Sequence, residues 1–145
     1  MISALLPIHL SFVGLWLGCV LTEALFERAL LGKGTEQVLT LVALHKRVDL
    51  IVEIPAFATV LITGALMYSS ETTSGLIHTK IAFGLLAIAA NVYCVWLVFQ
   101  RAVAAEEGNW KEFDRLDHKQ HKYGAVVLFA IIAALVIGVS VYGNA

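Results

Sequence analysis

The stretch "YGAVVLFAIIAALVIGVSVYG", Tyr123–Gly143, contains no charged residue and decides the fold class. At a rise of about 1.5 Å per residue, a helix of this length crosses the ~30 Å hydrocarbon core of a bilayer. Three further apolar runs of similar length precede it, at residues 3–22, 50–68 and 76–99. Because backbone polar groups must find partners inside a lipid-embedded segment, helices are the expected form of all four runs.

The composition agrees with this interpretation. The 145 residues are 59% hydrophobic and 14% charged, with a mean hydropathy of +0.83, whereas soluble domains carry about 25% charged residues. Alternating patterns typical of a membrane β-barrel are missing from the sequence. We therefore predict an all-α integral membrane four-helix bundle, a single domain over residues 1–145, with helices at about 3–30, 45–68, 76–103 and 112–143. Pro55 is predicted to kink the second helix, because proline lacks the backbone N–H.

Positive charges predict the orientation. The first and third loops carry the Lys and Arg residues, while the second loop, "YSSETTSGL", carries none. The positive-inside rule then places loops one and three in the cytoplasm and both termini on the outer side. We expect a multi-pass integral membrane protein, located in the inner membrane if the source is bacterial. The lipid bilayer is the expected partner, a homo-oligomer is left open, and no basic tract indicates nucleic acid.

Acids and histidines gather at the predicted cytoplasmic ends of three helices. Spacings of three or four residues place each group on one face of its helix. Bundle metal sites are built from such inward-facing carboxylates and imidazoles. The predicted metal ligands are Glu23 and Glu27 on the first helix, His45, Asp49 and Glu53 on the second, and Asp114, His118 and His121 on the fourth. Carboxylate and imidazole donors together suit iron, manganese or zinc, with two ions as an option.

Two other interpretations of these residues stay open. The acids could form a salt-bridged cluster with Arg28, Lys46 and Arg47, or be unrelated surface charge. Glu53 argues most strongly for a function, because ionisable residues inside a membrane are costly and usually functional.

The opposite ends of the helices carry a second, smaller set of candidates. His9 on the first helix and His78 on the third could be the two axial ligands of one haem b. Lys80 lies beside His78 in sequence, and its side chain could instead snorkel to the membrane surface. A di-haem electron carrier, in which His45 faces His118 or His121, is an alternative.

Three segments carry a family resemblance. The stretches "LPIHLSFVGLWLGCVLTEALFERAL", "KRVDLIVEIPAFATVLITGALM" and "LIHTKIAFGLLAIAANVYCVWLVFQR" resemble the first three helices of the HemJ-type protoporphyrinogen IX oxidases. That family consists of four-helix membrane bundles that bind haem b. The resemblance implies that His9 and Lys80 are catalytic residues and that the substrate is a porphyrin. Four-helix membrane proteins of the copper-resistance type are a further resemblance.

Glu53, His118 and His121 lie outside what the resemblance explains, and they suggest a relative that uses the same bundle for another metal-centred task. The sequence therefore leaves two hypotheses. In the first, the chain is a membrane redox protein that holds non-haem metal, haem or both, with a lipophilic substrate and a quinone or other electron partner. In the second, it is a non-catalytic membrane protein that binds or transports a metal.

Overall fold

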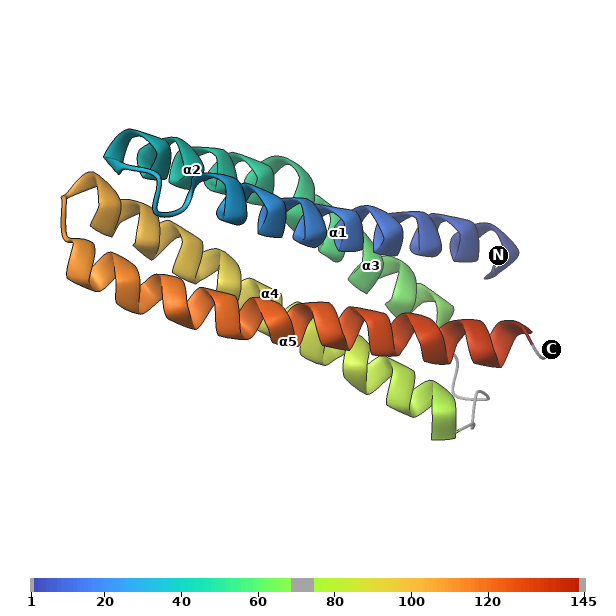
Figure 1. Ribbon diagram of the computed structural model, residues 1–145. Helices are drawn as coiled ribbons and strands as arrows, with labels where there is room; N and C mark the ends of the chain where they lie inside the picture. Colours follow the sequence, from blue (N-terminus) through green and yellow to red (C-terminus); the bar gives the residue numbers. More distant parts are fainter. Residues whose placement is uncertain (1, 69–74, 144–145) are drawn as a thin grey trace.

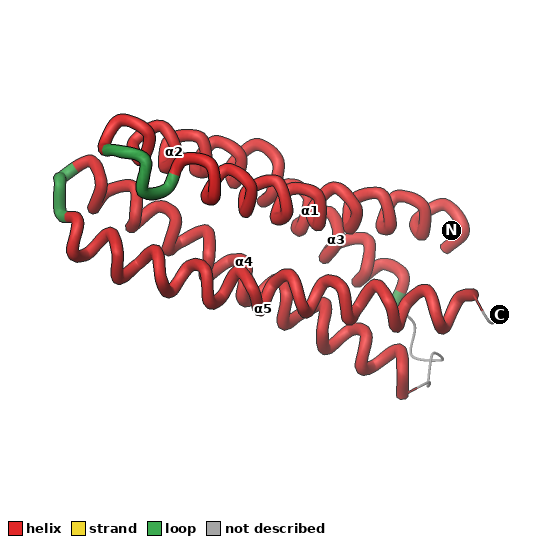
Figure 2. Tube along the Cα trace, in the orientation of Figure 1, coloured by secondary structure: helices red, strands yellow, loops and turns green. Residues whose placement is uncertain are grey.

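The computed structural model describes residues 2–68 and 75–143, and almost all of them are helical (Figures 1 and 2). The elements in chain order are α1 (Ile2–Leu30), α2 (Thr35–Val48), the π-helical turn η1 (Asp49–Glu53), α3 (Ile54–Met67), α4 (Gly75–Glu106) and α5 (Trp110–Gly143). The helices α2, η1 and α3 follow one another without a break. The second helical segment therefore begins at Thr35, earlier than the predicted residue 45.

Four helical segments are long and apolar enough to cross a membrane: Ala4–Leu30, Thr35–Met67, Gly75–Glu106 and Trp110–Val141. This confirms the predicted all-helical class and the number of such helices among the described residues. Large apolar side chains also cover the outside of the bundle, including Ile51 at 72% exposure and Phe129 at 65%. An apolar surface of this extent implies contact with a lipid bilayer. The side of the membrane on which the termini lie stays a prediction.

The long helices run along one another and form an elongated bundle (Figure 1). Helix α4 packs along α5, and α1 packs along α3. The α1–α2 turn and the α4–α5 turn lie at one end of the bundle, and the start of α1 and the end of α5 lie at the other end (Figure 1). The two loops predicted to be cytoplasmic are thus at the same end. Residues 69–74 of the predicted second loop lie outside the described residues.

Gly108 and Asn109 form the turn between α4 and α5. The Asn109 N–H donates to the Ala104 carbonyl at 2.8 Å and the Gly108 N–H to the Ala105 carbonyl at 3.1 Å, which is the pattern of a Schellman motif. Gly108 has φ 69°, the left-handed conformation that this motif needs. The Asn109 side chain then accepts the Glu112 N–H at 3.3 Å and caps α5.

Pro55 explains the π-helical turn that precedes it. A proline has no N–H to donate to the carbonyl four residues earlier, so the regular hydrogen-bond ladder fails at this point. The Ile54 N–H instead donates to the Asp49 carbonyl, five residues back. The structure thus places a π-turn where the sequence predicts a kink. Because a π-turn is wider than an α-turn, it changes the face on which the following residues lie, and Asp49 and Glu53 are both buried in it.

Two apolar cores lie along the bundle. A polar layer separates them, and it contains the buried residues Glu23, Glu27, His45, Asp49 and Arg101. The central core contains Trp16, Ala56, Ala87 and Val127, and the second core, near the two turns, contains Val42, Leu97, Phe113 and Leu116. On α1, Glu23 and Glu27 fall between Val20, which packs on the central core, and Leu31, which packs on the second. The buried acids are therefore held between two packed layers.

Gly14 and Gly18 are four residues apart, a spacing that in membrane helices often forms a close helix-packing face, but they do not pack closely within the described part of the chain. Both are exposed, and a Cβ built on either meets no atom within 4 Å.

Candidate metal centre

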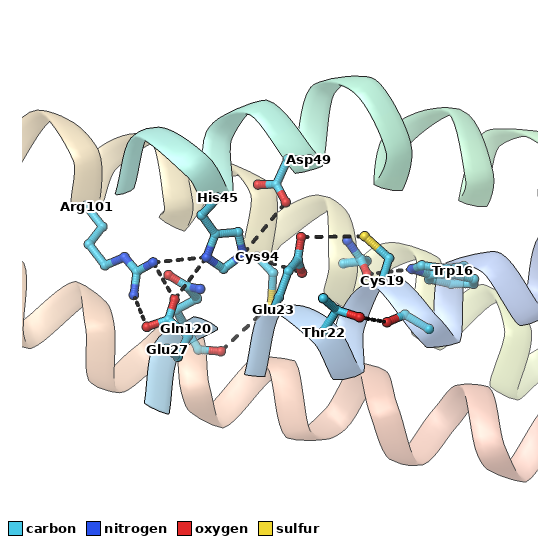
Figure 3. Close-up of polar contacts among 12 residues, drawn as sticks. Trp16, Cys19, Thr22, Glu23, Glu27, His45, Asp49, Cys94, Arg101 and Gln120 are labelled. Carbon is cyan, nitrogen blue, oxygen red and sulfur yellow. Dashed lines mark hydrogen bonds and ion pairs between the residues drawn. The ribbon is translucent and has the colours of Figure 1, made fainter. Parts of the chain in front are cut away.

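His45 lies at the centre of the polar layer and faces acids from two helical segments (Figure 3). Its Nδ1 lies 2.9 Å from Oε1 of Glu27. Its Nε2 lies 3.4 Å from Oε2 of Glu23 and 3.8 Å from Oδ1 of Asp49. All four residues are at most 6% exposed. The structure thus brings together four of the predicted ligands, two from α1 and two from the α2–η1 segment.

Arg101 of α4 is the cation that holds one side of this layer. Its side chain has 0% exposure, and its guanidinium donates to both Glu27 oxygens, at 2.6 and 3.1 Å. The same group donates to Asp117 of α5. A two-pronged guanidinium–carboxylate contact fixes the orientation of Glu27. Glu27 is therefore fully engaged as the partner of Arg101 and His45.

Among the described residues, no Arg or Lys pairs with the carboxylates of Glu23, Asp49 and Glu53 as Arg101 pairs with Glu27. Asp49 is 1% exposed, and neither of its carboxylate oxygens has a hydrogen-bond partner. Glu53 is 4% exposed, and one of its oxygens lies within 4.8 Å of donor atoms of Cys19 and Glu23. A second group with the same spacing joins Glu23, His45 and Asp49. A buried, unpartnered carboxylate is costly, and a bound cation removes that cost.

A cavity of about 520 Å³ opens onto these acids. Apolar side chains from α1, α4 and α5 form much of its wall. The polar and charged lining residues are Glu23, Glu27, Arg28, His45, Asp49, Glu53, Asn91, Gln120 and His121. The cavity therefore has room for an ion together with water or a further ligand.

The fourth helix brings one of its three predicted ligands, His121, into a potential ligand group. Asp114 and His118 are exposed and belong to none of the three potential ligand groups found among the described residues. Asp117 takes that place: it pairs with Arg101, and its Oδ2 lies 3.5 Å from Nδ1 of His121. His121 is itself exposed and lines the cavity, and it forms the third ligand group with Glu27 and Asp117.

The predicted outer residues are arranged differently from one another. His9 is 8% exposed, and its Nδ1 lies 2.8 Å from the Thr63 hydroxyl of α3. His78 is exposed near the start of α4. Lys80 is half-buried, and its side chain lies against Gly138 of α5, where a Cβ would come within 3.1 Å of the lysine Cε. The prediction that His9 and His78 bind one haem stays a prediction.

The sequence does not indicate Arg101 as a site residue, because its position next to the third loop is equally typical of a surface charge. Asn91 is not among the predicted site residues either; it is an amide inside the apolar run of α4 that accepts a hydrogen bond from Trp16 Nε1 at 2.9 Å. A polar residue within such a run is a usable signal of function. Of the three predicted salt-bridge cations, Arg28 is exposed but lines the cavity with the acids. Arg47 is exposed, and Lys46 Nζ lies 5.3 Å from the centre of the Phe99 ring.

The fold and site define a four-helix bundle with membrane-length helices and a buried carboxylate–histidine cluster. No protein-family model, no curated protein and no solved structure matches the chain. The resemblance to HemJ-type oxidases thus stays a prediction.

Proposed function

We propose that the chain is an integral membrane protein that binds a divalent transition metal through Glu23, His45 and Asp49, with Glu53 and Cys19 beside them. The observation that carries this proposal is the Asp49 carboxylate, which is 1% exposed, unpartnered and directed into the cavity with His45 and Glu23. A carboxylate in that position would otherwise add charge to a layer that is already rich in acids. A metal ion provides the missing positive charge.

The contacts of His45 support this role. If the Nδ1 hydrogen is donated to Glu27, Nε2 carries the free lone pair and faces Glu23 and Asp49. Metal-bound histidines commonly donate their other ring N–H to a carboxylate, which fixes both the tautomer and the orientation of the ring. Arg101 in turn fixes Glu27. The chain Arg101–Glu27–His45 therefore positions the imidazole.

The distances also suit one ion. Two donors that each bind a zinc ion at about 2.1 Å lie roughly 3 to 4 Å apart. The separations of 3.4 Å to Glu23 and 3.8 Å to Asp49 fall in that range. Glu23 belongs to both the group with His45 and the group with Cys19 and Glu53. A carboxylate shared in this way is suited to bridge a second ion.

The donor set favours iron, manganese or zinc over soft Cu(I). With iron or manganese the centre would be redox-active, which is the form of the function that we propose first. Zinc would point instead to a metal-binding protein without redox chemistry. We further propose that the end with the two basic loops faces the cytoplasm, which would place the metal on that side.

Metal retention tests the proposal. Purified protein is loaded in turn with Fe(II), Mn(II) and Zn(II), dialysed against a mild chelator and subjected to elemental analysis. We expect wild type to retain one or two ions per chain. We expect Asp49→Asn, which keeps the shape but removes the charge, to bind roughly tenfold more weakly or worse, since even outer-shell changes cost about 10–100-fold.

The matched control is Glu107→Gln, which removes an exposed carboxylate outside the helices. It should retain metal as wild type does. If wild type retains none of the three metals, or if Asp49→Asn and Glu107→Gln retain the same amount, the cluster is only a salt-bridged layer and the proposal fails.

A further inference from the structure

The cavity contains unpartnered polar atoms besides those of Asp49. Asn91 is 1% exposed, and its side chain lies near the Glu53 carboxylate, but its Nδ2 makes no hydrogen bond of good geometry. Its orientation is fixed, because Trp16 Nε1 can only donate and must therefore face the Asn91 oxygen. Gln120 of α5 is 7% exposed, and its Oε1 is also unpartnered. Both residues line the cavity. The lining thus offers a free donor and a free acceptor in addition to the carboxylates.

Buried groups of this kind need a ligand that both accepts and donates hydrogen bonds. A hydroxyl group does both. A metal ion bound to Asp49 would not itself satisfy the Asn91 donor, because a cation accepts no hydrogen bond, and only the nearby Glu53 carboxylate could do so. The two amides therefore point to a second occupant of the cavity, independent of the metal.

The rest of the cavity lining indicates the kind of molecule to which the hydroxyl group belongs. Apolar side chains form much of it: Val20 and Leu21 of α1, Val95 and Val98 of α4, and Val127 and Leu128 of α5. The volume of about 520 Å³ lies in the range of about 300–1,000 Å³ that is typical of sites for small organic molecules. A largely apolar molecule with a polar head fits such a lining.

The cavity reaches the surface between α1 and α5. Leu21, Ala24 and Ala125 line it and are also exposed, and the first of these is 48% exposed. Leu25 and Phe129, beside these residues in sequence, are each 65% exposed. The surface at these residues is thus apolar, and small alanine side chains from both helices leave room at the opening. Arg28 and His121, which also line the cavity, are exposed as well. In a membrane, such an opening admits molecules from the lipid.

We propose that the cavity binds a hydroxyl-bearing lipophile, which enters from the bilayer between α1 and α5 and places its hydroxyl against Asn91 and Gln120. The inference rests on the membrane placement in the proposed function, and it does not require the metal.

Photolabelling in liposomes tests the inference. The probe is an alkylphenol with a photoreactive diazirine in its tail, and labelled peptides are identified by mass spectrometry. We expect saturable labelling of α1 near Leu21–Ala24 and of α5 near Ala125–Leu128, displaced by unlabelled alkylphenol. The methyl ether of the probe accepts but cannot donate, so it should label these peptides roughly tenfold more weakly.

Two substitutions at the opening and one matched control complete the test. Ala125→Phe and Ala24→Phe fill the opening from opposite helices and should each abolish the saturable labelling. Val136→Phe enlarges a lipid-facing residue of α5 that is 58% exposed and does not line the cavity, and it should label as wild type does. Equal labelling by phenol and methyl ether, or labelling spread evenly over the exposed residues of α5, would overturn the inference.

Metal content of the same preparations separates the two proposals. If Ala125→Phe loses labelling and retains metal, both proposals stand. If wild type retains metal and shows no saturable labelling, only the lipophile site fails. If wild type is labelled and retains no metal, only the metal site fails.

Discussion

His9 and His45 are both buried histidines in long helices, yet their surroundings differ in kind. His9, 8% exposed, contacts a neutral hydroxyl, that of Thr63. His45, 5% exposed, lies among the carboxylates of Glu23, Glu27 and Asp49. A neutral hydroxyl asks for no charge from His9. Around His45, Arg101 balances Glu27, and the carboxylates of Glu23 and Asp49 still call for more positive charge than one imidazole can supply. The partners of a buried histidine, and not its burial, therefore indicate its role.

The largest loss of stability is expected from removing Arg101, the cation of the polar layer. Arg101→Leu leaves the buried Glu27 and the partly buried Asp117 without their guanidinium partner, and breaking a buried ion pair in this way costs about 3–5 kcal/mol. Arg101→Lys should recover part of that loss, because a single ammonium cannot make the two-pronged contact. Thermal unfolding of the detergent-solubilised protein measures both changes.

Arg115→Leu is the control for this substitution. Arg115 pairs with Glu112 on the surface of α5, where both side chains are exposed, and such surface pairs contribute little. Its melting temperature should match that of wild type. If Arg101→Leu and Arg115→Leu have the same melting temperature, Arg101 does not stabilise the polar layer.

The second prediction tests the two histidines directly. We expect His45→Ala to lower metal affinity roughly tenfold or more, since it removes a ligand where even outer-shell changes cost about 10–100-fold. We expect His9→Ala to leave metal retention unchanged, because its contact is with Thr63 in α3. Metal content after dialysis measures both. Equal loss in the two variants would contradict the distinction between the two regions.

Absorption spectra of the same preparations test the haem prediction. A haem held by His9 and His78 would give an intense band that is lost or shifted in His9→Ala and in His78→Ala but not in His45→Ala. A preparation without that band, from cells supplied with haem, would remove the predicted outer centre and leave the inner metal proposal as it is.

The helices could be predicted from the sequence because their apolar runs have membrane length. The grouping of Glu23, Glu27, His45 and Asp49 could also be predicted, since helical spacing and depth are simple functions of residue number. Two features could not. Arg101 lies where an apolar run meets a loop, so its position in the sequence fits a surface charge equally well. The π-turn depends on the hydrogen bonds that Pro55 withdraws, and the side-chain pattern does not reveal it.

The fourth helix shows a different limit. Spacing places Asp114 and His118 on one face of the helix, but it does not say which face points inward. The buried residues Phe113, Leu116, Gln120 and Val127 mark the inward face, and Asp117 lies beside them. The apolar members of this set were visible in the sequence and would have indicated Asp117 over Asp114.

The smallest effect is therefore expected at the exposed members of the predicted cluster. Asp114→Asn and His118→Ala should retain as much metal as wild type, because both side chains are exposed and neither belongs to a potential ligand group among the residues described. Asp117→Asn, three residues from Asp114 on the same helix, should weaken retention, because its carboxylate helps to hold Arg101 and, through Arg101, Glu27 and His45. Elemental analysis of the three variants under one dialysis protocol provides the comparison. If Asp114→Asn or His118→Ala loses metal while Asp117→Asn keeps it, α5 must turn a different face inward when the metal is bound, and the inner site would have to be rebuilt around the residues that the sequence first suggested.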